Sequence, residues 1–182
     1  MDEDKSNPAR PGRGGGVNAA VPMRPVDGAQ IEFLRHLPDV VLFCRDVTGS
    51  PIGYPMRTVA VTDAAIVFTT YRKSPKVAHL ERDPRACVLA TEWPRCPADP
   101  GVAAGWAVRW LSVSGRARVV TPTGDQIREV FGDGGRPDGE TRVPAGMADH
   151  VQDRLRDGKR VLVYVECLRS VGMQGGQFRE LV

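Results

Sequence analysis

The stretch 66–84 constrains the fold most, because it places a strand, a basic loop and a short helix in immediate succession. Its first four residues all favour the β conformation and predict the strand. Ser74 is a favourable N-cap, and Pro75 suits the first helical position, where its missing N–H costs nothing. The helix is expected to end at Asp83, because the residue before Pro84 avoids the α region.

The start of this helix is a candidate binding site for an anion. The first turn of a helix presents free N–H groups and partial positive charge, which attract negatively charged groups. Three basic side chains and three hydroxyls gather around it in the sequence: Arg72, Lys73, Lys76, Thr69, Thr70 and Ser74. This set suits a phosphate ester. A well-capped surface helix behind a solvated basic loop is the alternative interpretation.

Other apolar and β-branched runs predict further strands at 39–47, 56–62, 85–92, 106–121 and 160–168. Short helices are predicted at 27–37, with Asp27 as N-cap, at 123–131, with Thr123 as N-cap, and at 147–157, closed by Gly158. The chain is therefore expected to be a mainly β domain with flanking helices. We expect a kink at Gly115 in the long strand 106–121.

Arg57 is the unusual member of the run 56–62. Strict alternation places it on the same face as Val59 and Val61, which we expect to face the core. A charge on that face needs a partner. An arginine at a strand edge, in water, is the alternative.

Bulk properties narrow the class of protein. At 182 residues the chain suits one domain with a real core. The Pro- and Gly-rich residues 1–26 are expected to be a disordered extension, and residues 27–182 the folded domain. A net charge of +3 with 6% aromatic residues does not suggest nucleic-acid binding, and no apolar run is long enough to span a membrane.

The cysteines and histidines suggest neither a metal site nor a disulfide. Cys44, Cys87 and Cys167 lie in strand-like runs and are expected to be buried thiols, whereas Cys96 lies in a loop. No cysteine pair has the spacing of a zinc site, and the histidines are far apart in sequence. We therefore expect no bound metal, and reduced thiols in a cytoplasmic protein. The first residues also lack the features of a signal peptide.

The motifs described above recur together in one known family. They are the segments 57–62 and 66–70, the Ser74-Pro75-Lys76 triplet and the segment 80–85. In their order and spacing they resemble the flavin-binding core of the pyridoxamine 5'-phosphate oxidase-like split-barrel family, over about residues 27–121. The resemblance implies an antiparallel split β-barrel, a homodimer with a flavin-type cofactor at the subunit interface, and a small-molecule substrate.

The resemblance also implies roles for individual residues. Three groups of residues would contact the cofactor: Arg57, Ser74 and Lys76 at its phosphate, Thr69 and Thr70 along the phosphate-ribityl side, and the backbone amides near Thr58, Val59 and Ala60 at the ring system. Trp110 stands where the oxidase that gives the family its name has a glutamine that helps to hold the flavin. A tryptophan there stacks on a ring or a substrate, or packs in the barrel core.

The identity of the cofactor stays open between FMN and the deazaflavin coenzyme F-420. Arg57 favours FMN, whereas Pro75, in place of an arginine, and the helical insertion 123–157 favour the deazaflavin branch. No acid–base residue stands out, as expected if hydride transfer to or from a small molecule is carried by the cofactor. The C-terminal tryptophan and arginine pattern that serves the vitamin substrate is absent, so oxidation of that vitamin is not expected.

Two other classes of function remain. One is a non-catalytic flavin or haem carrier or sensor that uses the same binding site. The other is a cofactor-free module whose basic loop contacts an acidic partner, with binding that weakens in salt.

Overall fold

The structure, a computed structural model, describes residues 26–92, 109–132, 145–174 and 177–179. The described helices are α1 (Gly28–His36), α2 (Pro75–Arg82), α3 (Gly124–Phe131) and α4 (Ala145–Arg156). The described strands are β1 (Asp39–Arg45), β2 (Pro51–Val61), β3 (Ala65–Tyr71), β4 (Arg85–Glu92), β5 (Arg109–Val120), β6 (Arg160–Gln174) and β7 (Gln177–Arg179).

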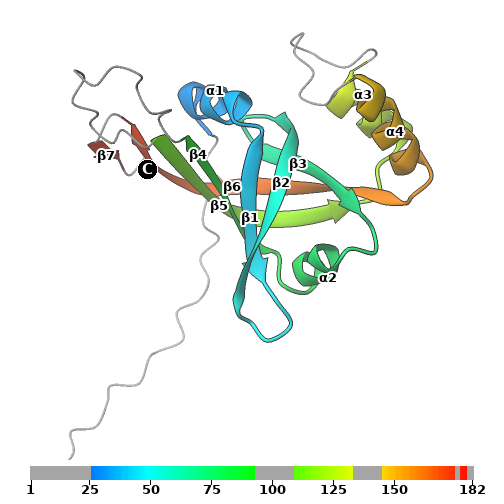
Figure 1. The fold of residues 1–182 in the computed structure, drawn as a ribbon, viewed down its shortest axis with the longest axis horizontal. Coiled ribbons are helices and arrows are strands. Elements are labelled where there is room, and N and C mark those ends of the chain that lie inside the picture. The colour runs from blue at the N-terminus through cyan, green and yellow to red at the C-terminus, as the bar shows by residue number, and fades with distance from the viewer. Residues whose placement is uncertain (1–25, 93–108, 133–144, 175–176, 180–182) are drawn as a thin grey trace, which may run out of the picture.

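Six antiparallel strands form a closed barrel in the order β3-β2-β1-β4-β5-β6, and β6 pairs back onto β3 (Figure 1). β7 pairs with the last residues of β6, 172–174. Alternate side chains of the strands fill the barrel, among them Leu42, Phe68, Val88, Val113 and Val163, none of which is exposed. The predicted mainly β fold with an antiparallel barrel and flanking helices is therefore confirmed.

Two strands are longer than predicted. β2 begins at Pro51 rather than at Met56, and β6 continues to Gln174 rather than ending at Leu168. The prolines of β2 are tolerated because residues 51–57 pair with β1, while the β2–β3 pairs begin only at Thr58. The missing N–H of a proline has no cost on a side of the strand where no neighbouring strand would accept its hydrogen bond.

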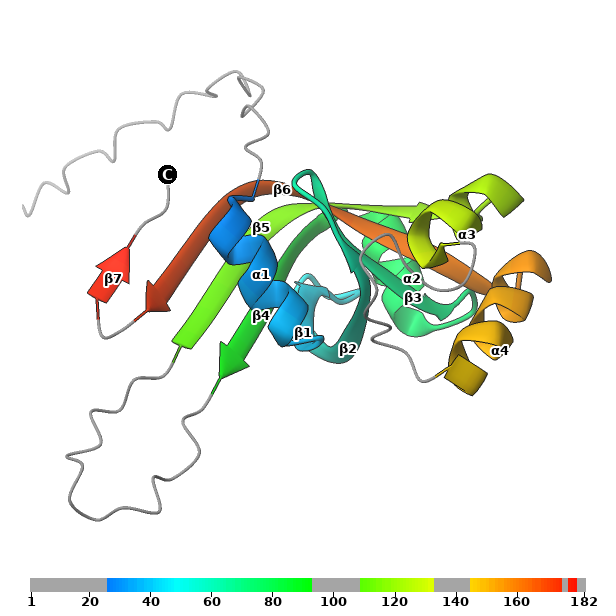
Figure 2. The same ribbon diagram turned by 90° about the horizontal axis from the view of Figure 1, so that it is seen from above.

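The helices begin where their caps predict. Asp27 and Thr123 each form a capping box, with Gln30 and Gln126 respectively. α4 is followed by Gly158, whose φ of 67° suits only glycine without strain. Figure 2 shows α3 and α4 together beside the start of β6.

α3 and α4 cover the outer face of β3 and β6. Their apolar side chains form a second cluster outside the barrel, made of Ile127, Phe131, Val151 and Leu155 with the strand residues Val67 and Leu162. Because this face is covered by the chain itself, any ligand must reach the barrel elsewhere.

Gly115 marks an irregularity in β5, as predicted. The register between β5 and β6 shifts between Ser114 and Gly115. A Cβ at Gly115 would lie 2.1 Å from the carbonyl oxygen of Glu166, so only glycine allows this approach.

Two predicted features lie outside the described residues. They are the N-terminal extension, apart from its last residue, and the loop 93–105, which contains Cys96. None of the described helices is long and apolar enough to cross a membrane.

Candidate functional site

β2 and β3 diverge part of the way along the barrel. Their pairs run from Val61 with Ile66 to Thr58 with Phe68 and continue no further. Beyond that point β2 stays with β1, whereas β3 stays with β6 as far as Tyr71. The barrel wall is therefore split where β3 leads into α2.

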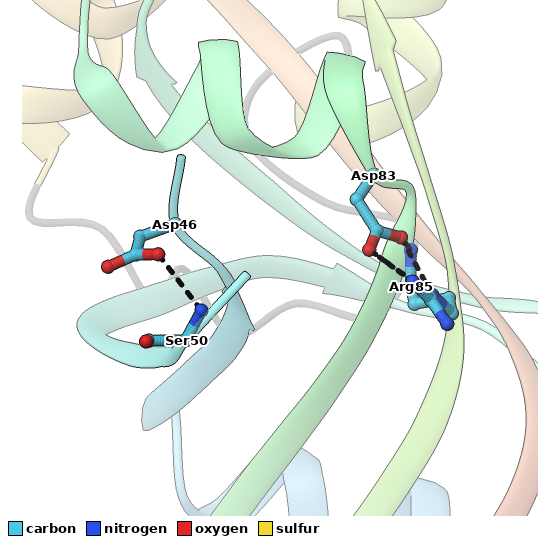
Figure 3. A network of polar contacts seen from close by, with 4 residues as sticks. All are labelled: Asp46, Ser50, Asp83 and Arg85. Carbon is cyan, nitrogen blue, oxygen red and sulfur yellow. Dashed lines mark hydrogen bonds and ion pairs between the residues drawn. The ribbon is translucent and has the colours of Figure 1, made fainter. Parts of the chain in front are cut away.

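α2 follows β3 at this split and packs against β1 and β5. Val77 and Leu80 are buried in the barrel core and hold the helix against it. Its other end is fixed at Asp83, which accepts hydrogen bonds from the side chain and the backbone N–H of Arg85 (Figure 3). The Arg85 side chain lowers the pKa of Asp83 well below its usual range. The N-terminus of α2 is consequently held next to the split.

Ser74 is the N-cap of α2, as predicted, but its hydroxyl does not cap the helix. No side-chain capping bond forms, and Oγ is buried without a hydrogen-bond partner among the described residues. A buried hydroxyl without a partner costs about 1–3 kcal/mol. Such a group fits a ligand that would accept its hydrogen bond, and a phosphate oxygen is such an acceptor.

Lys76 adds a positive charge one residue beyond Pro75. Its Nζ lies 3.5 Å from Met56 Sδ and 5.1 Å from the centre of the Tyr54 ring. In the described part of the chain no carboxylate lies within 4 Å of this ammonium. Burial, and secondarily the charge of Arg160, lowers the pKa of Lys76. A half-buried cation without an anionic partner is suited to bind an anion.

Arg160, at the start of β6, is a second cation at this end of the barrel. It donates to the side chain and carbonyl of Thr69, both at 3.2 Å, and lies 4.5 Å from the centre of the Tyr71 ring. Sequence reasoning did not single out Arg160, because only the non-local pairing of β3 with β6 brings it here.

The two predicted threonines lie on opposite faces of β3. Thr70 is 5% exposed and points into the barrel, whereas Thr69 is half-buried on the outer face beside Arg160. Neighbouring residues of a strand always alternate in this way. The two side chains therefore cannot face the same part of a ligand.

A hollow of about 490 Å³ lies on the outer side of β2, β1 and β4. Its walls are mostly apolar and come from Asp39, Val40, Val41, Pro55, Met56, Arg57, Leu89 and Thr91. The volume is in the range of small-molecule sites. Met56 is among the residues that line the hollow, while its Sδ contacts Lys76 on the inner side of β2.

Arg57 does not share a face with the core, and this expectation was wrong. A β-bulge between Thr58 and Ala60 shifts the alternation, so that Met56 and Thr58 are buried and Arg57 points outward. Arg57 does have a partner, since its guanidinium donates to both oxygens of Asp39, at 2.8 and 2.7 Å. These hydrogen bonds are the main reason why the pKa of Asp39 is lowered.

The remaining predicted residues lie around the hollow and the bulge. Thr58 is fully buried, while Val59 and Ala60 pack against the α3–α4 cluster. Trp110 is half-buried and is the register partner of Thr91, which lines the hollow. The structure thus places Ser74 and Lys76 together at the start of α2, Arg57 at the wall of the hollow and Trp110 beside the lining residue Thr91.

The thiols take no part in this arrangement. Cys44 and Cys167 are buried as expected, but Cys87 is half-buried, with Sγ 3.1 Å from Ser112 Oγ. All three are free cysteines.

The chain was compared with known families, with curated proteins and with solved structures. A family model described as pyridoxamine 5'-phosphate oxidase matches residues 27–163. A comparison with curated proteins found no match.

Three solved structures share the fold. The conserved hypothetical protein Rv2991 from Mycobacterium tuberculosis is 22% identical, with a TM-score of 0.57 over 84% of this chain and 87% of that one. A Clostridium acetobutylicum protein related to general stress protein 26 is 9% identical, with a TM-score of 0.57 over 81% and 87%. A heme binding protein from Mycobacterium smegmatis is 16% identical, with a TM-score of 0.58 over 82% of this chain and 55% of that one.

Proposed function

The chain belongs to the pyridoxamine 5'-phosphate oxidase family, and we propose that it is an oxidoreductase that binds a phosphorylated flavin-type cofactor. Its reaction is hydride transfer to or from a small molecule. The observation that carries the proposal is the buried, unpartnered hydroxyl of Ser74 beside the half-buried ammonium of Lys76.

Ser74 and Lys76 bind the phosphate of the cofactor. The Ser74 hydroxyl donates to a phosphate oxygen, and the Lys76 ammonium neutralises the negative charge. The N-terminus of α2 adds its partial positive charge at the same place. Arg160 adds a second positive charge nearby, and Thr69 or Thr70 faces the ribityl side.

The hollow on the outer side of β2, β1 and β4 takes the ring system. Its apolar walls suit a flat aromatic group, with Trp110 next to the lining residue Thr91. When the cofactor binds, the guanidinium of Arg57 leaves Asp39 and pairs with the phosphate instead. The flavin, when bound, supplies the hydride chemistry, and the protein binds and orients it and keeps water from the ring.

FMN and the deazaflavin coenzyme remain the two candidates for the cofactor. Each carries a phosphate and a flat ring system, so the site described above suits either. We favour FMN, because Arg57, the residue by which the resemblance favours FMN, lies at the wall of the hollow.

Titration of the purified protein with each cofactor, followed by absorbance and fluorescence, tests the proposal. We expect saturable binding of one cofactor, and about 30-fold weaker binding by Lys76→Met, because a hydrogen bond to a charged group is lost. Lys159→Met is the matched control, since Lys159 is exposed and paired with Asp157. Failure of the wild-type protein to bind either cofactor would disprove the proposal.

A non-catalytic flavin or haem carrier or sensor is the second candidate. The titratable side chains that line the hollow, Asp39 and Arg57, are bonded to each other, so the described lining offers no free acid or base. One of the structures that share the fold is a heme binding protein. Stopped-flow reoxidation of the reduced, cofactor-loaded protein separates the two functions, because a carrier shows no dependence on the electron acceptor.

A further inference from the structure

Tyr54 of β2 is held at two points by α2. Its hydroxyl lies 3.0 Å from Nδ1 of His79, and its ring lies beneath the ammonium of Lys76, 5.1 Å from ring centre to Nζ. Lys76 and His79 are three residues apart on the helix and therefore share a face. Both contacts join α2 to the part of β2 that no longer pairs with β3.

The Tyr54 ring is one of two groups in described contact with the Lys76 ammonium. The other is Met56 Sδ, a weak acceptor at 3.5 Å. A lysine side chain has four rotatable bonds, and ordering its ammonium has an entropic cost. An aromatic face beneath the ammonium offsets part of that cost, because it attracts a cation.

We propose that Tyr54 is a positioning residue for Lys76, directing the ammonium to the phosphate of the bound cofactor, and that His79 fixes the Tyr54 ring for this purpose. The inference rests on the proposed function and adds two residues to the site. Neither residue touches the phosphate. Their effect is transmitted through Lys76, so it must depend on the presence of a phosphate in the ligand.

Comparison of FMN with riboflavin, which lacks the phosphate, tests this inference. The ratio of the riboflavin dissociation constant to that of FMN measures what the phosphate contributes to binding. If the wild-type protein binds only the deazaflavin coenzyme, the same ratio is measured for that coenzyme with and without its phosphate-bearing chain.

We expect Tyr54→Leu to lower this ratio about threefold to tenfold, as for loss of a cation–π contact. Tyr54→Phe keeps the ring and restores most of the ratio, and His79→Leu lowers it about twofold. When Lys76 is already replaced by Met, Tyr54→Leu has no further effect on the ratio, because the ammonium through which Tyr54 acts is absent. If circular dichroism shows that Tyr54→Leu folds poorly, Tyr54→Met is used instead, because methionine fills much of the side-chain volume but has no aromatic ring.

Tyr164→Leu is the matched control. Tyr164 is also a half-buried tyrosine under a cation, with Arg118 4.7 Å from its ring centre, but it lies on the outer face of β6 with the α3–α4 cluster. This variant leaves the ratio unchanged. Equal weakening of FMN and riboflavin binding by Tyr54→Leu would overturn the inference alone, whereas a wild-type protein that binds neither cofactor would overturn the proposed function as well.

Discussion

At the scale of single residues, the site depends on polar groups that lack protein partners. Ser74 has a buried hydroxyl without a hydrogen bond, and Lys76 has a half-buried charge without a carboxylate, both among the described residues. The chain accepts the energetic cost of both groups in one place. A ligand that satisfies both at once therefore gains more than it would from either group alone.

Ser74→Ala is expected to have opposite effects on stability and on binding. Removing an unpartnered buried hydroxyl leaves the free energy of unfolding unchanged or raises it by up to about 1 kcal/mol. FMN binding weakens about threefold to tenfold, because one neutral hydrogen bond to the phosphate is lost. Chemical denaturation and fluorescence titration measure the two effects. A large loss of stability would show instead that Ser74 caps α2.

Asp39→Asn is expected to strengthen binding of the phosphorylated cofactor, by about twofold to fivefold. Asp39 now occupies the guanidinium of Arg57, and an exposed pair of this kind is worth only about 0.2–1 kcal/mol. Asp157→Asn, which breaks the exposed pair with Lys159, serves as the control. Weaker binding by Asp39→Asn would mean that Asp39 holds Arg57 in its functional position.

The cysteines are expected to react with thiol reagents at very different rates. Burial raises the pKa of the Cys167 thiol to about 11, so little thiolate is present at pH 8 and its reactivity keeps rising up to about pH 11. Cys87 is only half-buried and should be modified first among the three described thiols. Single-cysteine variants that retain Cys87 or Cys167, followed with a chromogenic disulfide reagent between pH 7 and 10, measure the difference. Equal rates would indicate that the barrel opens readily.

The sequence was sufficient to select the candidate residues at the start of α2, but not the residues that other strands bring next to them. Ser74 and Lys76 could be selected because capping and charge are local properties. The face of Arg57 was predicted wrongly, since a bulge of one residue reverses the alternation and leaves no clear sign in the run 56–62. Tyr54 and Arg160 could not be selected, because pairing between distant strands and helices brings them to the site.

At the scale of elements, the local signals were the reliable ones. Both predicted N-caps, Asp27 and Thr123, begin their helices, and Gly158 ends α4 as expected. The ends of β2 and β6 were missed because strand length depends on the partner strand. Turn residues such as Pro51 and Pro55 can lie inside a strand when one side of it is unpaired.

Gly115→Ala is expected to destabilise the barrel by about 1–3 kcal/mol, because the new Cβ would overlap the Glu166 carbonyl in the neighbouring strand. Gly124→Ala is the matched control, since a Cβ at this position of α3 meets nothing within 4 Å. Urea denaturation compares the two variants with the wild-type protein. Similar stability of the two variants would mean that β6 moves aside at little cost.

At the scale of the whole molecule, the barrel has an apolar outer surface that the described helices leave open. Val41 and Phe43 of β1 and Leu89 of β4 are half-buried there, and Phe43 packs over Gly53. The antiparallel barrel was predicted through the family resemblance rather than from hydrophobic patterns. Patterns identify strands but not which distant strand each one joins.

We expect the protein to be a homodimer that joins through this outer face of β1 and β4. Phe43→Asp should shift the protein to monomers. It should also weaken cofactor binding, because the hollow lies on the same face and the partner subunit would form its second wall in the dimer. Val47→Asp, at a residue 74% exposed in the turn after β1, should leave the dimer intact. Sedimentation velocity over a range of concentrations measures both variants. A wild-type protein that remains monomeric throughout would exclude this arrangement.

The divergence of β2 from β3 also bears on how a ligand is loaded. Beyond Thr58 and Phe68 no described ladder joins β2 to β3, and the contact of Tyr54 with Lys76 joins β2 to α2. Swinging these side chains aside breaks none of the backbone ladder. We therefore expect ligand uptake and release to proceed at rates set by rotamer changes, while the backbone amides of the barrel stay protected against deuterium exchange.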